Sequence, residues 1–228
     1  MPKSNAGWVT SALAVYTKDL RQELRSRYGM STILMFGITT LTVVSFSFGQ
    51  SGLPSKVMAA LYWIVMFFSA MSGLAQVFVR EEESGTAMAL RLSAEPEAVF
   101  AGKYGFNLSL LAIMTAVITP IFLIFNDVPP GWGGLQFGLM VSLGIVGLCG
   151  GTTLVAAIIS RAAVRGALFA VLAFPILIPL LFVLISGTDK ALSALPLGEM
   201  LAELQFLFAY AVVMTTGSVM LFRFVWSD

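Results

Sequence analysis

The chain has 228 residues, of which 58% are hydrophobic and 11% are charged, and its net charge at pH 7 is +1. Because soluble domains carry about 25% charged residues, this composition excludes a soluble globular protein and indicates an integral membrane protein. The near-neutral charge gives no argument for a nucleic-acid partner. With no histidine and one cysteine, Cys149, the chain lacks the residues for most metal sites, for imidazole ligation of haem and for an internal disulfide.

The first 29 residues combine basic and apolar side chains and lack the central apolar run of a cleavable signal peptide. At about 100° per residue, the apolar side chains fall within an arc of about 160°, which Asp19 and Glu23 interrupt. We predict that residues 1–29 form a helix at the cytoplasmic membrane surface, in contact with lipid. This helix either only anchors the protein or also cradles a partner. The apolar arc comprises Trp8, Ala12, Leu13, Tyr16, Leu20 and Leu24, and Lys18, Arg21 and Arg25 lie opposite it.

Six apolar runs follow, each close to the length of about 20 residues that a helix needs to cross the hydrocarbon core. We therefore predict an all-α integral membrane protein in which residues 30–228 form a six-helix transmembrane domain. The spans are predicted at 30–48, 57–79, 104–125, 135–159, 167–187 and 201–222.

The basic residues are divided unevenly between the two sides that six spans define. Only Lys56 and Lys190 fall on one side, and the other eleven fall on the side that includes both termini. Because lysine and arginine accumulate in cytoplasmic loops, both termini and the segment 80–103 are predicted to be cytoplasmic.

The segment 80–103 holds eight of the 25 charged residues between two long apolar runs. A charge at the bilayer centre costs several kcal/mol, so this segment must reach water. It is long enough to be docked by another protein. The alternative is a solvated acidic loop that only separates the second and third spans.

The fourth span is rich in small residues, and Gly144, Gly147 and Gly151 are candidates for close helix packing. Small residues on one face of a membrane helix let a second helix approach closely. The partner helix belongs either to the same subunit or to a second copy of the chain.

The fifth span contains two prolines four residues apart, Pro175 and Pro179. Each removes a backbone donor, so we predict a kink in this helix. The kink is either static or part of a hinge or of a pathway lining.

No span carries a lysine, arginine or aspartate near its middle, which argues against a proton relay or an ion-coupled transporter. The chain also lacks the glycine-rich loop with lysine that binds ATP phosphates, and it lacks a Ser/His/Asp or Cys/His set. We therefore expect a protein that is not itself an enzyme.

The residues from Arg80 to Lys103 resemble the coupling region of ABC-2 type exporter permeases. In those permeases an acidic cluster and a Gly-Thr pair precede a short helix that inserts into a cleft on the ATPase subunit, and a Gly-Lys pair leads into the third span. Here Gly85-Thr86 and Gly102-Lys103 match the two pairs. The resemblance implies that the acidic residues pair with basic groups of an ATPase and that Leu90 and Leu92 fill its apolar cleft. The implied docking set is Glu81, Glu82, Glu83, Gly85, Thr86, Leu90, Arg91 and Leu92.

Over nearly its whole length, the chain is similar to CcmB, the haem exporter protein B family of cytochrome c maturation. The similarity is carried by the chain length, by the run from Arg80 to Thr86, by Arg165-Gly166 before the fifth span and by Phe174-Pro175-Ile176-Leu177-Ile178-Pro179. The last segment is similar to the family's Pro-Leu-x-x-Pro signature.

This resemblance implies a permease subunit in the bacterial inner membrane that couples ATP hydrolysis to the release of haem-loaded chaperone at the outer face. The implied partners are a cytoplasmic CcmA-like ATPase, CcmC-like and CcmD-like membrane proteins, a haem chaperone and a second copy of this chain. The chain would bind no cofactor directly, because ATP lies on the partner and the complex handles haem.

Two alternatives remain at this point. One is a generic ABC-2 exporter permease for a lipid, glycan or peptide, which gene neighbours would distinguish. The other is an ATP-independent membrane scaffold, which would have no stable ATPase partner.

Overall fold

The computed structural model describes residues 5–26, 28–48, 53–74, 81, 85–126, 128, 130–159 and 165–227. In this part of the chain every regular element is a helix. The elements are α1 (Asn5–Ser26), α2 (Tyr28–Phe48), α3 (Ser55–Leu74), α5 (Ala87–Ser93), α6 (Pro96–Phe125), α7 (Gly134–Ile159), α8 (Arg165–Leu192), the 3-10 helix η1 (Leu197–Met200) and α9 (Leu201–Ser227).

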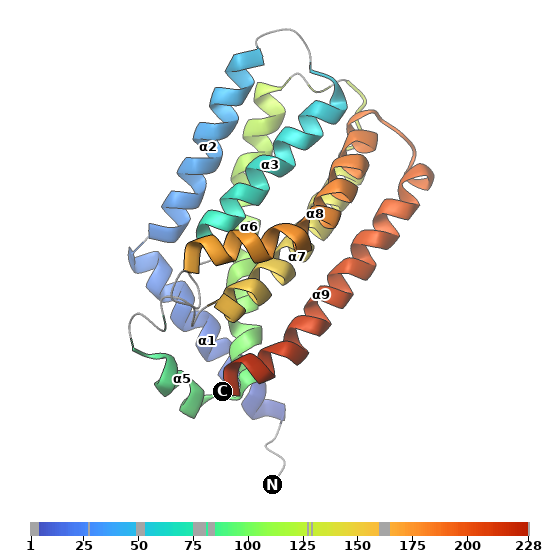
Figure 1. Cartoon of the computed structure of the whole chain (residues 1–228). Coiled ribbons are helices and arrows are strands. Elements are labelled where there is room, and N and C mark those ends of the chain that lie inside the picture. Colours follow the sequence, from blue (N-terminus) through green and yellow to red (C-terminus); the bar gives the residue numbers. More distant parts are fainter. Residues whose placement is uncertain are drawn as a thin grey trace.

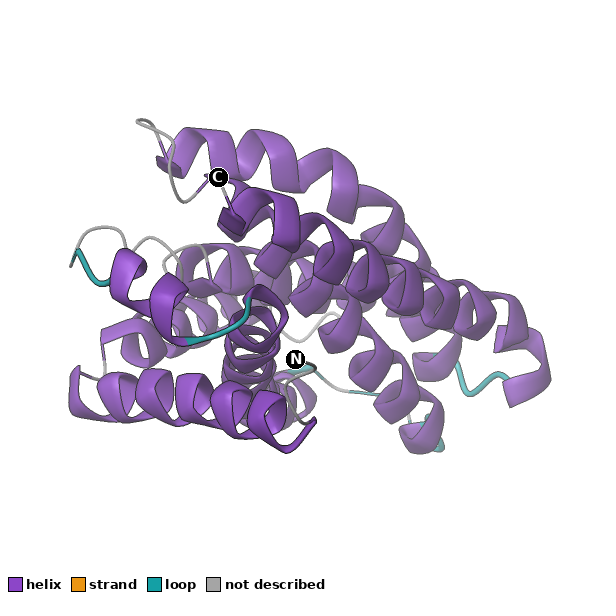
Figure 2. Cartoon of the chain, turned by 90° about the horizontal axis from the view of Figure 1, so that it is seen from below, coloured by secondary structure: helices purple, strands orange, loops and turns teal. Residues whose placement is uncertain are grey.

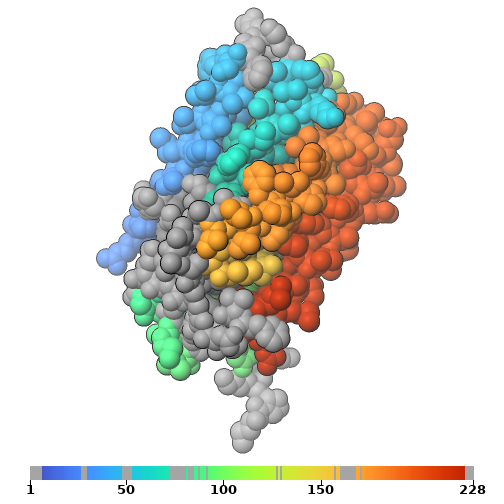
Figure 3. Space-filling view, viewed as in Figure 1, coloured from blue at the N-terminus to red at the C-terminus, as the bar shows by residue number. Residues whose placement is uncertain are grey.

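The long helices form a bundle, and α1 and α5 lie at one of its ends, where α9 also ends (Figure 1). α1 packs mainly against α6, and α7 packs most extensively against α8 and α9. Figure 2, seen from the end that holds α1 and α5, shows helices joined by loops. In the space-filling view, α2, α3, α8 and α9 account for most of the coloured surface on the visible side (Figure 3).

Five of the described helices contain an apolar stretch long enough to cross a membrane. α3 contributes a shorter apolar stretch, Ser55–Met71, and the second predicted span, 57–79, ends outside the described residues. The prediction of a multi-pass, all-α membrane protein is therefore confirmed, whereas the sixth span and the orientation stay predictions. The five stretches are Met30–Ser47, Pro96–Phe125, Gly134–Ala156, Val171–Leu192 and Leu197–Arg223.

Several helices extend beyond the spans predicted from apolar runs, and α6, α8 and α9 do so by five or more residues at one end. α6 begins at Pro96 instead of residue 104. Proline suits the first position of a helix, because a backbone N–H at that position has no partner within the helix and proline carries none. α8 continues to Leu192 instead of residue 187. Its polar last turns have partners on α3, since Trp63 Nε1 donates to Thr188 Oγ1 at 2.8 Å and Ser55 donates to Asp189.

The core of the bundle contains an aromatic cluster centred on Tyr62, which is fully buried. Its ring makes edge-on contacts with the rings of Trp63, Phe122 and Phe137, at centroid distances of 5.3, 5.1 and 5.4 Å. Such edge-to-face pairs add stability beyond the buried area. They join α3, α6 and α7 into one unit.

The three candidate packing glycines of α7 face helices of the same chain. A Cβ atom at Gly144 would lie 2.1 Å from the Trp63 ring, and one at Gly151 would lie 2.6 Å from Leu177. Gly147 packs against Leu180. These glycines therefore let α7 approach α3 and α8 within one subunit.

α8 changes direction along its length. In Figure 1 its first turns run across the bundle and its later turns run along it. Pro175 and Pro179 both lie within this helix and are exposed on the surface of the single chain. Between them, the Ile176 carbonyl accepts a hydrogen bond from Tyr210 Oη of α9 at 2.8 Å. The outward position of both prolines means that they do not line an interior path through one subunit.

Candidate functional site

The short helix α5 presents two apolar side chains to solvent at the end of the bundle that holds α1. The side chain of Leu92 is 80% exposed and that of Met88 is 64% exposed. They are four residues apart, so they lie on the same face of the helix. Leu90, in contrast, is half-buried and packs against the hydrophobic core. Contiguous exposed apolar side chains mark surfaces that contact another protein or the membrane.

The resemblance implied that Leu90 and Leu92 both fill a cleft on the ATPase, but in the structure these two side chains face in different directions. Residues two apart cannot share one face of an α-helix, so only Leu92 of that pair points outward. Met88 is the outward partner that the sequence analysis missed. Helical spacing from Leu92 would have found it. We call Met88 and Leu92 the α5 face.

Gly85 and Thr86 shape the approach to α5. Gly85 has a φ of +68°, a left-handed conformation that glycine adopts without steric cost. The Thr86 N–H then donates to the Glu81 carbonyl at 3.0 Å, and Thr86 Oγ1 donates to Glu81 Oε2 at 2.6 Å. The Thr86 carbonyl accepts from the Leu90 N–H at 3.0 Å. The Gly-Thr pair therefore ties the first turn of α5 to Glu81.

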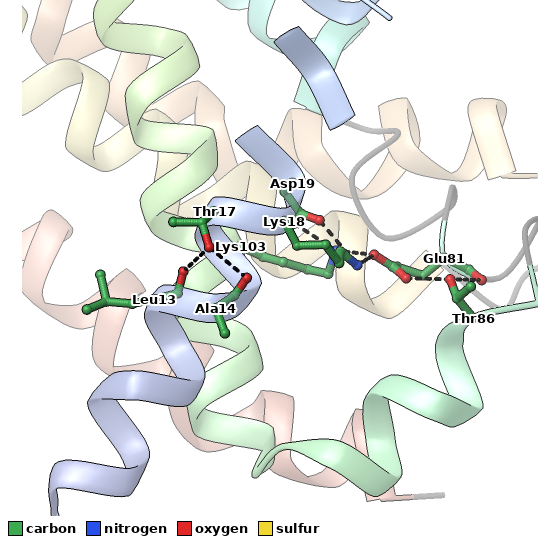
Figure 4. A network of polar contacts seen from close by, with 8 residues as sticks. All are labelled: Leu13, Ala14, Thr17, Lys18, Asp19, Glu81, Thr86 and Lys103. Carbon is green, nitrogen blue, oxygen red and sulfur yellow. Dashed lines mark hydrogen bonds and ion pairs between the residues drawn. The ribbon is translucent and has the colours of Figure 1, made fainter. Parts of the chain in front are cut away.

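Glu81 is a buried residue within the chain's own polar network, with 5% of its surface exposed. Its Oε1 atom lies 3.2 Å from Lys103 Nζ and also accepts a hydrogen bond from Lys18 (Figure 4). The predicted role of Glu81 was to pair with basic groups of an ATPase. Two lysines of its own chain already occupy this carboxylate, which gives it an internal role.

The charges around Glu81 keep it ionised. Burial raises the pKa of its carboxyl, but the charge of Lys103 and the hydrogen bonds from Lys18 and Thr86 outweigh burial and lower this pKa to about 2. Burial likewise lowers the pKa of Lys18, and Glu81 and Asp19 outweigh that effect and raise it. Glu81 and Lys18 are therefore both charged at neutral pH.

α1 supplies the remaining acids of this network. Asp19 Oδ2 lies 3.1 Å from Lys103 Nζ, and Asp19 Oδ1 lies 3.4 Å from Lys18 Nζ. Glu23, one turn further on, is buried and accepts a hydrogen bond from the Met30 N–H at 2.6 Å, near the start of α2. Asp19 and Glu23 therefore do not interrupt a membrane-facing surface of α1, as the apolar arc suggested, because they face the protein.

Gly102 lets α6 approach α1 closely beside this network. A Cβ atom at Gly102 would lie 2.6 Å from the Ala12 carbonyl oxygen and 2.7 Å from Val15 Cβ. The next residue, Lys103, is fully buried. The Gly-Lys pair thus has two functions in packing, close contact with α1 and charge pairing.

Three residues of the predicted docking set lie wholly or partly outside the part of the chain that the structure describes. Glu82 and Glu83 lie outside the described residues, and so does the side chain of Arg91, whose backbone belongs to α5. Their docking roles stay predictions.

Within the described part of the chain, no group of three or more histidine, cysteine, aspartate or glutamate side chains could hold a metal ion. Cys149 is buried in α7.

The opposite end of the bundle is joined by a second ion pair. Lys190 Nζ of α8 lies 2.7 Å from Glu203 Oε1 of α9, and Ser186 donates to the same oxygen at 3.0 Å. Lys190 also donates to the Glu199 carbonyl at 2.7 Å. This pair links the last turns of α8 to the first turns of α9.

The comparisons with known proteins support one family. The CcmB protein family matches residues 10–227, a range that includes α1 from residue 10 onward, the α5 face and the long helices from α2 to α9. The comparison with curated proteins gave no match. The chain therefore belongs to the CcmB protein family, and this membership indicates the permease of an ABC transporter in cytochrome c maturation.

Proposed function

We propose that this permease couples ATP hydrolysis by a separate cytoplasmic ATPase to haem handling, through docking of the ATPase on the α5 face. The observation that carries the proposal is the exposure of Met88 and Leu92 on a short helix whose first turn is tied by hydrogen bonds of Thr86 to the buried Glu81. Because methionine is flexible and polarizable, it suits an apolar cleft on a partner.

The docking surface has an apolar centre and a charged border in this proposal. The α5 face fills a cleft on the ATPase, and Glu82 and Glu83 pair with basic groups around it. Glu81 is reassigned to the interior, because it is buried against Lys18 and Lys103. Closure of two ATPase subunits on ATP would push α5 of each permease copy toward its bundle.

The proposed orientation puts α1, α5 and both termini in the cytoplasm of a bacterium, with the chain in its inner membrane. The uneven distribution of basic residues supports this orientation. The location of α1, α5 and the end of α9 at one end of the bundle agrees with it (Figure 1).

Haem would be held by other members of the complex. The chain has no histidine for an axial ligand. We propose that two copies of the permease act with the ATPase, with CcmC-like and CcmD-like membrane proteins and with a haem chaperone that leaves at the outer face. The permease itself would catalyse no reaction and bind no cofactor.

The test is affinity purification of the tagged full chain from native membranes in mild detergent, followed by mass spectrometry. We expect a Walker-motif ATPase together with CcmC-like and CcmD-like proteins. The double variant Met88→Glu, Leu92→Glu should lose the ATPase and keep the membrane partners. A matched control is Leu135→Glu, because Leu135 is similarly exposed but lies at the start of α7.

Each outcome bears on a different part of the proposal. An ATPase without the other membrane proteins would favour a generic exporter. Absence of any ATPase from an intact preparation would favour a scaffold. Full ATPase recovery with the double variant would refute docking on the α5 face.

A further inference from the structure

Three segments of the chain meet at one buried lysine. Lys103 of α6 pairs with Asp19 of α1 and with Glu81, which precedes α5. We call these three residues the lysine bridge. We propose that Lys103 is a positioning residue that fixes the approach to α5 onto α1 and α6, so that a push on α5 moves the three elements together. This inference rests on the proposed docking of an ATPase on α5.

The burial of the bridge makes it a strong constraint. Lys103 has no exposed surface, and Asp19 and Glu81 are 6% and 5% exposed. Without Lys103, the carboxylates of Asp19 and Glu81 would share the charge of Lys18, whose side chain is 42% exposed. One buried negative charge would then be uncompensated among these residues, which is strongly unfavourable. The arrangement that keeps all three charges paired is therefore favoured over arrangements in which the approach to α5 moves away.

The bridge is connected to α5 by hydrogen bonds as well as by the chain. One carboxylate oxygen of Glu81 faces Lys103, and the other accepts from Thr86 Oγ1 at 2.6 Å. The Thr86 carbonyl in turn accepts from the Leu90 N–H in the first turn of α5. Displacement of α5 therefore pulls directly on Glu81.

On the other side, the bridge is connected to two closely packed helices, α1 and α6. At Gly102 the backbone of α6 lies against Ala12 and Val15 of α1, with no space for a further carbon atom. One turn and a half beyond Lys103, Ser109 hydrogen bonds to Tyr16 Oη at 3.1 Å. Movement received by Lys103 would thus be shared by α1 and α6.

Glu23 extends the connection to α2. Its carboxylate accepts from the Met30 N–H, and its side chain is buried on the same face of α1 as Asp19. A rotation or shift of α1 would therefore act on the cytoplasmic end of the first predicted span.

The ion pair between Arg223 and Glu97 lies at the same end of the bundle as the lysine bridge but, unlike the bridge, is exposed. Arg223 Nε lies 3.9 Å from Glu97 Oε1, and the Arg223 side chain is largely exposed. Exposed pairs of this length contribute little. Glu97 also lies on α6, so Glu97→Gln is a matched control for changes in the lysine bridge.

The first test measures hydrogen exchange of the full chain in lipid nanodiscs, without any partner. We expect Lys103→Met to increase amide exchange of residues 86–94 about tenfold or more. Glu81→Gln should do the same, and it provides a second variant if Lys103→Met does not fold. Glu97→Gln should match the wild type. Wild-type exchange in both bridge variants would overturn the proposal.

The second test uses the complex purified with its ATPase. In the wild type, binding of a non-hydrolysable ATP analogue should change the exchange of residues 12–19 in α1. With Glu81→Gln the ATPase should still co-purify, but this nucleotide-dependent change should be lost. A structural role alone would leave the change intact, and that result would also overturn the proposal.

The two tests separate this inference from the proposed function. If the double variant of Met88 and Leu92 still recruits the ATPase, docking on the α5 face is wrong. Faster amide exchange of residues 86–94 in the bridge variants would then still show that the lysine bridge holds α5 in place. The proposal that the bridge transmits movement from the ATPase through α5 would be refuted.

Discussion

Lys103 in α6 reaches back 22 residues to Glu81, with 3.2 Å between Nζ and Oε1. Between them the chain forms the turn at Gly85, the helix α5 and the first turns of α6. The pair therefore closes the base of a loop whose exposed tip is the α5 face. A docking helix held at its base in this way presents a defined surface to a partner, which lowers the entropy lost on binding.

The two leucines of α5 should have separable effects. Leu90→Ala removes a side chain that packs against the core, so we expect it to destabilise the region around α5 by about 1–3 kcal/mol. Leu92→Ala removes an exposed side chain and should leave stability within about 0.5 kcal/mol of the wild type. ATPase recovery should fall with Leu92→Ala. Thermal unfolding in detergent and co-purification would be measured for both variants. Equal losses of stability would contradict the opposite orientations of these side chains.

Gly102→Ala should weaken the contact between α1 and α6. The added Cβ atom would meet the Ala12 carbonyl oxygen, which is backbone and cannot move aside alone. We expect a loss of about 1–3 kcal/mol in the free energy of unfolding. The control is Gly105→Ala, since its Cβ atom would lie at an ordinary 3.6 Å from Tyr16. A loss in the control as large as that in Gly102→Ala would show that helix packing at Gly102 is not the cause.

Gly144→Ala should perturb the aromatic core. Its Cβ atom would lie 2.1 Å from the Trp63 ring, which the surrounding core holds in position. Overpacking of this kind costs about 1–3 kcal/mol, and more where the neighbour is fixed. Gly138→Ala on the same helix meets nothing within 4 Å. It should be neutral or stabilising by up to about 1 kcal/mol, because alanine favours helix. Thermal unfolding of the two variants in one detergent compares them, and an unaffected Gly144→Ala would contradict the close contact of α7 with α3.

The stability that Glu81 provides should depend on pH. Its pKa is about 2 in the folded chain against an ordinary value of 4.5. The difference corresponds to about 3 kcal/mol, which is fully present above pH 4.5, where both folded and unfolded chains are ionised. As pH falls from 4.5 toward 2, the unfolded chain takes up the proton first and this contribution is lost.

Denaturation of the wild type and of Glu81→Gln at several pH values checks this prediction. Near neutral pH the free energy of unfolding should be larger for the wild type than for Glu81→Gln. This difference in the free energy of unfolding should become smaller at pH 3. Because every other acidic group is common to both proteins, the difference isolates Glu81. A difference that stays constant down to pH 3 would show that the carboxylate gains no pairing energy on folding.

Part of this molecule follows directly from local sequence. Apolar runs of about 20 residues have the length of a membrane-spanning helix, and a helix satisfies every backbone group in lipid within one segment. The helical bundle was therefore predictable without any knowledge of contacts. The charged segment 80–103 was expected to leave the membrane for a different reason, the cost of placing charges in hydrocarbon. Gly85-Thr86 precedes the short helix as the resemblance implied, and glycine permits the left-handed turn there. The start of α6 at Pro96, eight residues before the predicted span, was missed, although proline at a first helical position is a local signal.

The orientation of individual side chains depended on neighbours distant in the sequence. Whether Leu90 or Met88 faces solvent is decided by the side of α5 on which the bundle lies, and the pattern within α5 is apolar on both sides. In the same way, Asp19 and Glu23 looked like interruptions of an apolar surface. They are buried because Lys103 and the start of α2 supply their partners.

Local sequence thus determined which segments are helices and which segment leaves the membrane, because these depend on propensity and on the cost of moving polar groups into hydrocarbon. Only the tertiary structure decided which charges are internal and which apolar groups remain for a partner. The reason is physical: a carboxylate such as Glu81 can be buried only where a cation such as Lys103 is brought to it. That meeting is a property of the packed helices.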